Sequence, residues 1–299
     1  MKRYAFTLVE LLVAMSIIAI LGALSLGGLH MARESARKTK TRSTVTKISQ
    51  HIDHAWEEFR VRRVPMKPTG TDRCAIQKLL WNARRDMLRL EMPDRWSDVF
   101  GGPLVLPEEE ARGKYGRYQA VYNNARTELL ARDLDDDGVP DLTPEEVDAM
   151  LASVEQSECL FMVVTAFAGR APWRPSEIGD TDDDGLPEFV DGWGNPIAWL
   201  RWPAGYPAAD PMPINYSPAI GIQSLGPRPL ILSAGPVGEY GVNRGLEPDP
   251  DPANEYMTYR YMLDFNGDLN PWTLDEAPPF RQIGEQTRDD AHDNLTNYD

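Results

Sequence analysis

Residues that build catalytic centres and covalent scaffolds are scarce in this chain. Its 299 residues include two cysteines, Cys74 and Cys159, and four histidines. Two cysteines are too few for a disulfide scaffold, and their spacing matches no zinc motif. They leave two alternatives, one disulfide that closes a long loop or two buried free thiols. The sequence also lacks the Gly-x-Ser-x-Gly, phosphate-loop and His-Glu-x-x-His motifs, which argues against an enzyme.

Positive charge is scarce beyond residue 67. The net charge is −15, but residues 1–67 hold 12 Lys and Arg against 5 acidic residues, which leaves −22 for the remainder. An acidic body argues against binding to nucleic acid, and it suits divalent cations or high solubility.

A long apolar run is present at the N-terminus. Lys2 and Arg3 precede about 24 residues whose only ionisable side chain is Glu10, and a helix of that length crosses a bilayer of about 30 Å. A carboxylate within such a run costs about 2.5 to 3.5 kcal/mol and is expected to have a partner. We therefore predict a transmembrane helix over residues 6–29.

The residues around Glu10 form a motif. Phe6-Thr-Leu-Val-Glu10-Leu-Leu, after a short basic leader, resembles the class III signal of type IV pilins and of the pseudopilins of type II secretion systems. The resemblance implies that a prepilin peptidase cuts between Ala5 and Phe6 and methylates the new amine, and that Glu10 serves in assembly. The family usually has Gly before the cut, so Ala5 departs from the pattern. The alternatives are an uncleaved anchor and a secretory signal cut near Ala23-Leu-Ser25, although the apolar run exceeds the roughly 7 to 15 residues of such signals.

The resemblance also implies a location and partners. It places the chain in the bacterial inner membrane as a single-pass protein, with its body on the extracytoplasmic, periplasmic side. The implied partners are the prepilin peptidase, other pilin or pseudopilin subunits and the inner-membrane assembly platform. Basic residues follow the apolar run, and by the positive-inside rule they favour the opposite orientation, so the predicted orientation depends on the resemblance.

The remaining sequence predicts an α+β protein with a small antiparallel sheet. We divide it into a leader (1–5), the transmembrane helix (6–29), an amphipathic stalk helix (30–64), an acidic helical insertion with a loop (65–170), a second acidic loop (171–191), a pilin-like β region (192–280) and a polar, disordered tail (281–299).

Apolar periodicity and capping signals place the helices. The stalk carries a stripe with helical spacing, which we expect to lie on the sheet. Further helices are expected over residues 71–91, 108–132 and 143–167, and the last opens with a capping box at Thr143. The stripe consists of Val45, Ile48, Ile52, Trp56 and Phe59.

Two acidic loops share the pattern Asp-x-Asp-x-Asp-Gly. Carboxylates at alternate positions with a glycine at the sixth are what a calcium ion with six to eight oxygen ligands requires. The first loop resembles an EF-hand between two helices, but its twelfth position is Pro144. The alternative for each loop is an acidic turn in which Asp caps its own backbone. The predicted calcium ligands are Asp133, Asp135, Asp137 and Asp141 in the first loop, and Asp180, Asp182, Asp184, Glu188 and Asp191 in the second.

The segment after the second loop has a looser resemblance to the major pseudopilins. Asp191-Gly-Trp-Gly-Asn-Pro196 is similar to the segment that leads into the sheet of those proteins, and residues 230–241 are similar to a later strand and turn. We expect strands over residues 198–202, from residue 230, and over 256–263. The long connection over residues 203–229 is rich in proline.

Together these features predict a structural subunit with no enzymatic activity. The expected protein is a minor pseudopilin of a type II secretion-like or type IV pilus-like filament, with a calcium-stabilised body. One alternative is a minor pilin with an adhesive or cargo-recognising head, and another is an enzyme anchored by its signal. The large helical insertion favours a minor subunit, because a bulky head is awkward to repeat along a thin fibre.

Overall fold

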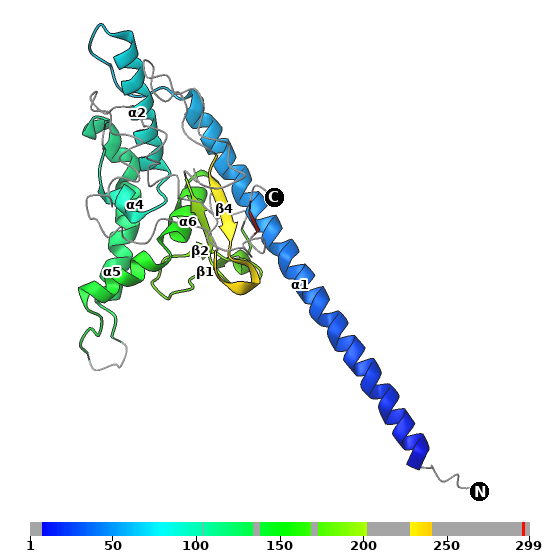
Figure 1. Ribbon diagram of the computed structural model, residues 1–299. Helices are drawn as coiled ribbons and strands as arrows, with labels where there is room; N and C mark the ends of the chain where they lie inside the picture. The colour runs from blue at the N-terminus through cyan, green and yellow to red at the C-terminus, as the bar shows by residue number, and fades with distance from the viewer. Residues whose placement is uncertain are drawn as a thin grey trace, which may run out of the picture.

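One long helix carries the rest of the protein on its C-terminal half. In the computed structural model, helix α1 (Leu8–Val61) has 54 residues, and the body lies against one side of its second half while its N-terminal half projects away (Figure 1). The structure describes residues 8–103, 105–133, 138–168, 173–201, 228–240 and 295–296, and some helical residues, including Glu10 and Cys74, by their backbone alone.

The body combines short helices with two small antiparallel sheets, which confirms the predicted α+β class. Strands β1 and β2 form one sheet, and β4 lies between β3 and β5 in the other. The helices are α2 (Arg73–Glu91), α3 (Trp96–Phe100), α4 (Glu108–Leu130), α5 (Pro144–Ser153) and α6 (Glu155–Ala168), with short 3-10 turns at Pro175–Glu177 and Gly235–Val237. The strands are β1 (Ile178–Gly179), β2 (Glu188–Phe189), β3 (Ile197–Leu200), β4 (Leu230–Ser233) and β5 (Leu295–Thr296).

The apolar stripe of α1 is buried against the body, as its spacing predicts. Its five members are at most 6% exposed, and the helix contacts α6, β4 and β5. Burial of each large apolar side chain contributes about 1.5 to 3 kcal/mol, so this stripe is a main attachment of the body to α1.

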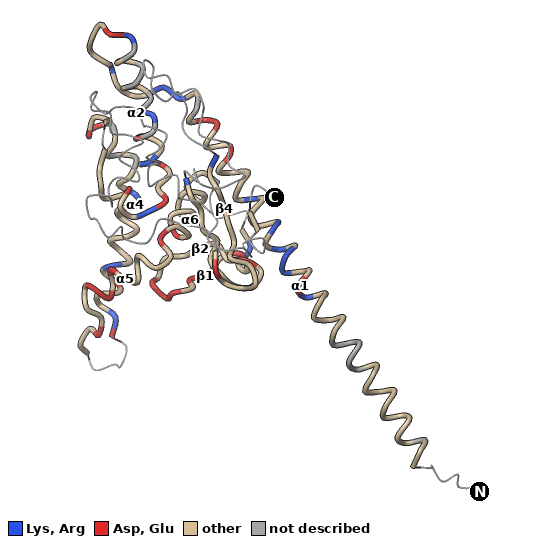
Figure 2. The backbone as a smooth tube through the Cα atoms, in the orientation of Figure 1, with Lys and Arg blue, Asp and Glu red and all other residues tan. Residues whose placement is uncertain are grey.

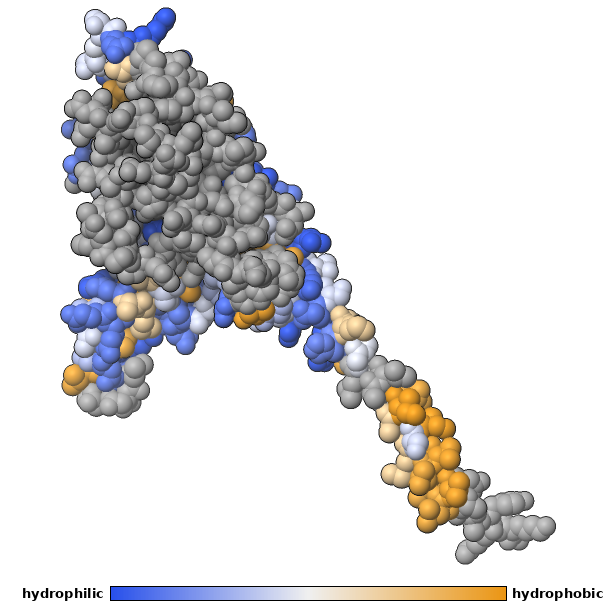
Figure 3. Space-filling view, viewed as in Figure 1, coloured by the Kyte–Doolittle hydropathy of each residue, from blue (hydrophilic) through white to orange (hydrophobic). Residues whose placement is uncertain are grey.

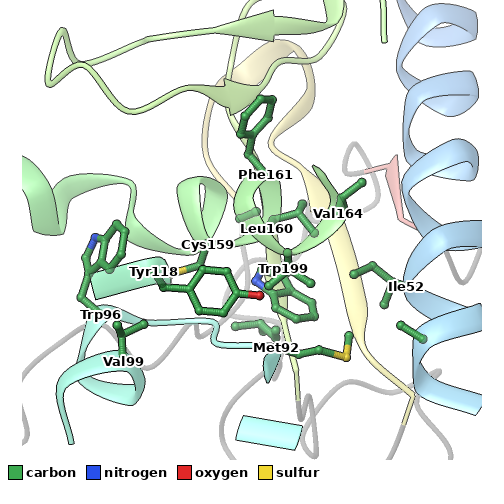
Figure 4. Close-up of a cluster of buried hydrophobic side chains, with 14 of the residues drawn as sticks. Ile52, Met92, Trp96, Val99, Tyr118, Cys159, Leu160, Phe161, Val164 and Trp199 are labelled. Atoms are coloured by element: carbon green, nitrogen blue, oxygen red, sulfur yellow. The ribbon is translucent and has the colours of Figure 1, made fainter. Parts of the chain in front are cut away.

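Both faces of the β3–β4 pair are covered. Every residue of β3 and β4 is buried, with Ile197 opposite Ser233 and Leu200 opposite Leu230. A short, continuously apolar run is typical of a strand with no solvent-exposed face. Figure 4 shows Trp199 of β3 among side chains of α6 and near Ile52 of α1, so the main core lies between α1, the sheet and the helical insertion.

Cys159 is part of this core. It is a buried free thiol in the structure, close to Tyr118 in Figure 4. Of the two alternatives, Cys159 therefore matches the buried free thiol and not the disulfide. Burial is the main reason that the pKa of the thiol is raised well above its ordinary value. The side chain of Cys74 lies outside the described residues.

The predicted helix over residues 143–167 is wrong in one respect, because the chain forms two helices there. The capping box at Thr143 is present, since its side chain accepts a hydrogen bond from the Glu146 amide and the Glu146 side chain accepts one from the Thr143 amide. Helix α5 then ends at Ser153, with Val154 as its C-cap, and α6 continues at an angle of 65°. The bend leaves α5 on α4 and turns the apolar side of α6 towards α1 and the sheet. Packing therefore overrides the continuous helical pattern.

The tail also differs from its prediction. Leu295 and Thr296 form β5, which pairs antiparallel with Ser233 and Leu232 of β4. The β region thus gains an edge strand from a segment whose composition alone predicts disorder. The predicted strand over residues 256–263 and most of the connection over residues 203–229 lie outside the described residues.

Candidate functional site

The N-terminal half of α1 is an exposed apolar surface. The large hydrophobic side chains described between Leu8 and Leu21 are each at least 50% exposed, and Figure 3 shows them as a hydrophobic end beyond the body. Among the described residues, no single helix is both long and apolar enough to cross a membrane. The described apolar stretch of α1 is Leu11–Leu21. Helices α5 and α6 are long and apolar enough only when taken together, and the chain bends by 65° between them. Ala5 and Phe6 lie outside the described residues, and Glu10 is described by its backbone alone.

The turn that follows β2 fixes the body to α1. Asp191 Oδ1 accepts hydrogen bonds from the amides of Trp193 and Asn195, at 2.8 and 2.9 Å, and its Oδ2 accepts one from the Ser233 hydroxyl at 2.7 Å. The Gly192 amide donates to the Thr41 hydroxyl of α1 at 2.8 Å. Both Asp191 oxygens therefore accept hydrogen bonds, Oδ1 within the turn and Oδ2 from Ser233 of β4. The structure thus gives Asp191 a role in holding the turn, and its role as a calcium ligand stays a prediction.

The second acidic loop connects β1 to β2. Asp180 accepts hydrogen bonds from the amides of Asp184 and Gly185, at 3.1 and 3.0 Å, so its carboxylate caps the loop backbone. Gly185 has a φ of +90°, which L side chains rarely adopt and which the glycine of the motif permits. The turn geometry that the motif predicts is therefore present.

Three carboxylates converge beside this loop. Glu158 of α6 lies with Asp182 and Asp184 so that one ligand atom from each is within 4.8 Å of the others. Glu158 and Asp184 are each 1% exposed. Figure 2 shows acidic residues on the loop before β2 and on α5, while basic residues gather along α1. The structure thus brings two predicted ligands together with one that the sequence reasoning missed.

Burial and mutual repulsion dominate the electrostatics of this cluster. The pKa of Glu158 is raised to about 11, first by burial and then by the charge of Asp184. Burial likewise raises the pKa of Asp184 to about 6 and that of Glu188 to about 7. So much negative charge in an enclosed place needs protons or a cation as counter-charge.

Glu188 lies at the end of the loop, on β2. Its Oε1 accepts a hydrogen bond from the Thr181 amide at 2.5 Å, and its buried Oε2 has no hydrogen-bond partner in the described structure. Glu188 is therefore a buried acid of the same loop, although its oxygens are not among those of the three-carboxylate group.

The first acidic loop is described only in part. Gly138 has a φ of +85°, and its amide donates to Asp133 Oδ2 at 2.7 Å, just as Gly185 donates to Asp180. The Asp141 amide donates to the Arg132 carbonyl at 3.1 Å. The predicted ligands Asp135 and Asp137 lie outside the described residues, so calcium at this loop stays a prediction.

Comparison with known proteins assigns a motif to the N-terminus only. A family model described as "Prokaryotic N-terminal methylation motif" matches residues 1–26. Neither the curated proteins nor the solved structures contain a match to the chain. The matched residues include Ala5, Phe6 and Glu10, and the motif implies processing by a prepilin peptidase and assembly with other pilin subunits. Residues 1–26 therefore carry a class III prepilin signal, which supports the resemblance to type IV pilins and pseudopilins.

Proposed function

We propose that this protein is a pilin-like filament subunit, and more narrowly a minor pseudopilin of a type II secretion-like machine. The observation that carries the proposal is the N-terminal methylation motif at residues 1–26. A long helix whose apolar end stands clear of the body suits the same role. The role is structural, and it includes no catalytic step.

In this proposal, the apolar end of α1 anchors the subunit in the inner membrane before assembly, with the body on the periplasmic side. The prepilin peptidase removes residues 1–5 and methylates the amine of Phe6. Glu10 of one subunit then neutralises the Phe6 amine of its neighbour. A buried carboxylate is costly without a counter-charge, so the pairing favours association through the apolar helices. The assembly platform of the inner membrane supplies the site at which subunits join.

The helical insertion supports a minor subunit. Helices α2 to α6 lie between the stalk and the β region in the sequence, and they form a bulky side of the body in Figure 1. A body of this size suits the tip of a filament better than a repeated position. The same insertion supports the alternative, a minor pilin whose head binds an adhesive ligand or cargo. Binding of a surface ligand or of secreted cargo by the purified full chain in detergent favours the alternative, and binding of neither favours a purely structural subunit.

The test of the central proposal is the mature N-terminus. Mass spectrometry of the protein from a host with a prepilin peptidase is expected to show N-methylated Phe6 and no residues 1–5. Glu10→Ala is expected to abolish filament assembly, whereas the control Glu58→Ala, an exposed glutamate on the same helix, leaves assembly intact. A chain that still begins at Met1, or normal assembly of the Glu10→Ala variant, contradicts the proposal.

Calcium is part of the proposed function, as a ligand that stabilises the body. The support is the pair of Asp-x-Asp-x-Asp-Gly loops and the oxygen-only character of their side chains.

A further inference from the structure

We propose that one calcium ion binds between α6 and the β1–β2 loop, held by the carboxylates of Glu158, Asp182 and Asp184. The inference rests on the calcium part of the proposed function and is independent of filament assembly. In the site predicted from the sequence, one loop supplies all the ligands. In the site proposed here, the ligands come from two parts of the fold, the helical insertion and the β region.

The spacing of the three carboxylates fits a single ion. Calcium binds oxygen at about 2.3 to 2.6 Å, so two oxygens on one ion lie at most about 5 Å apart. One ligand atom from each residue lies within 4.8 Å of the other two. The group is therefore close enough to share an ion without rearrangement of the backbone.

Each of the three residues uses one oxygen and leaves the other without a partner. Glu158 Oε2 accepts from the Trp96 indole at 3.0 Å, Asp184 Oδ1 accepts from the Leu186 amide at 2.7 Å, and Asp182 Oδ2 accepts from the Ser153 hydroxyl. Glu158 Oε1, Asp184 Oδ2 and Asp182 Oδ1 are buried and have no hydrogen-bond partner among the described residues. A buried oxygen without a partner costs about 1 to 3 kcal/mol, more if it is charged. Three such oxygens in one group need a counter-charge, either a cation or a proton shared between Glu158 and Asp184.

The ligand chemistry selects calcium among the common ions. The group offers only carboxylate oxygens and neither sulfur nor nitrogen, which suits a hard cation and not zinc or copper. Magnesium prefers one or two carboxylates and keeps several waters, whereas calcium accepts a larger, less regular set of protein oxygens. A mostly buried group of three carboxylates therefore fits calcium better.

Two of the remaining predicted ligands, Asp180 and Asp191, act as backbone caps in this arrangement. Asp180 caps the loop through the amides of Asp184 and Gly185, and Asp191 caps the following turn. The caps hold the loop so that Asp182 and Asp184 face α6. The bend at Val154 brings the other side of the site into place, because Ser153 ends α5 and Glu158 lies in the first turns of α6.

The experiment compares calcium with a chelator on the full chain in detergent. Calcium at about 100 times its dissociation constant is expected to raise the melting temperature by about 5 to 10 °C. In Glu158→Gln, which retains an acceptor for the Trp96 indole, one fewer calcium ion per chain should bind, as measured by equilibrium dialysis. The same variant in chelator should melt no lower than the wild type, because glutamine is neutral, has nearly the same shape as glutamate and adds no charge to the buried group.

Glu128→Gln is the matched control, because Glu128 is exposed on α4. It should bind as many calcium ions as the wild type and show the same shift in melting temperature. Equal calcium stoichiometry in Glu158→Gln and the wild type overturns the shared site, as does a wild type that binds no calcium. Neither result bears on the methylation of Phe6, which tests the filament function separately.

Discussion

Arg201 is a fully buried cation that joins the helical insertion to the sheet. It follows β3, and its guanidinium lies 2.9 Å from an oxygen of Asp98 and 3.3 Å from one of Asp94. Its Nη1 also donates to the Met92 carbonyl at 2.8 Å. Burial alone would raise the pKa of Asp98, but Arg201 and Arg89 hold it below the ordinary value. The charges therefore stabilise one another only as a complete group.

Substitution Arg201→Met should destabilise the protein by about 3 to 5 kcal/mol, because Asp94 and Asp98 lose the buried guanidinium that both contact, and Arg89 remains beside Asp98. Chemical denaturation measures the loss. Arg126→Met is the control, since Arg126 pairs with Asp148 where both side chains are at least 33% exposed, and an exposed pair contributes at most about 1 kcal/mol. Similar losses in the two variants would show that the burial of Arg201 does not matter.

Tyr118 is expected to make the stability of the protein depend on pH in the alkaline range. Its hydroxyl donates to the Glu91 carbonyl at 2.8 Å, and burial raises its pKa to about 12 from 10.0. A raised pKa means that the folded state keeps a proton that the unfolded state loses, so stability falls as the pH rises from about 10 to about 12. The expected loss is about 2 to 3 kcal/mol across that interval.

The free energy of unfolding of Tyr118→Phe, measured by denaturation between pH 9 and pH 12, should vary less with pH than that of the wild type. The variant should be about 1 kcal/mol less stable at neutral pH, because it lacks the hydrogen bond to Glu91. If the stability of the variant falls with pH as steeply as that of the wild type, groups other than Tyr118 cause the loss of stability at alkaline pH.

Local patterns at the residue scale predict loop chemistry but not partners across the fold. The Asp-x-Asp-x-Asp-Gly pattern predicts the turn at Gly185, whose positive φ is a local property. Glu158 and Arg201 carry no such signal, because the carboxylates that they meet lie 24 to 107 positions away in the sequence. The available hint was a pair of glutamates, Glu155 and Glu158, at the start of the otherwise mostly apolar α6, since a buried charge is expected to have a partner.

At the scale of elements, α1 and the turn after β2 approach each other too closely for a side chain. A methyl group on Gly192 would lie 2.5 Å from the Arg37 carbonyl of α1. The Trp193 indole also donates to Glu34 of α1 at 3.2 Å. The Gly-Trp pair thus combines close backbone contact with a hydrogen bond, which explains physically why this segment suits attachment to a stalk helix.

Gly192→Ala should therefore destabilise the protein by about 1 to 3 kcal/mol, as overpacking at a rigid contact does. Gly113→Ala is the matched control, because Gly113 lies within α4 and nothing lies within 4 Å of an added methyl group. That control should be stabilised by about 0.5 to 1 kcal/mol through helix propensity. Thermal denaturation of both variants measures the difference in stability. Equal changes in melting temperature would show that the backbone near Arg37 can shift to accommodate the added methyl group.

Elements with a strong local period were predictable, and those that depend on distant packing were not. The helix predicted over 71–91 is observed over Arg73–Glu91, and that predicted over 108–132 over Glu108–Leu130. No glycine or proline lies at the bend between α5 and α6, so the sequence gives no signal for it. Strand β5 exists only because β4 offers it an edge, which composition does not reveal.

At the scale of the whole molecule, the body should fold without the apolar end of α1. Among the described side chains, Glu34 is the first residue of α1 that bonds to the body, through Trp193. Deletion of residues 1–28 is therefore expected to change the free energy of unfolding by less than about 0.5 kcal/mol. Denaturation of the shortened and full chains in the same detergent measures this, and a large loss would mean that the apolar end supports the body.

The projecting half of α1 constrains how the protein can move between environments. Ten large apolar side chains from Leu8 to Leu21 are at least half exposed, and full transfer of that set into water costs on the order of 10 to 20 kcal/mol. Lipid and a bundle of like helices are both apolar phases, so exchange between them involves little of that cost. In the proposed filament, a subunit is therefore expected to pass directly from the lipid to the helix bundle, because exposure of its apolar end to water costs more than either state.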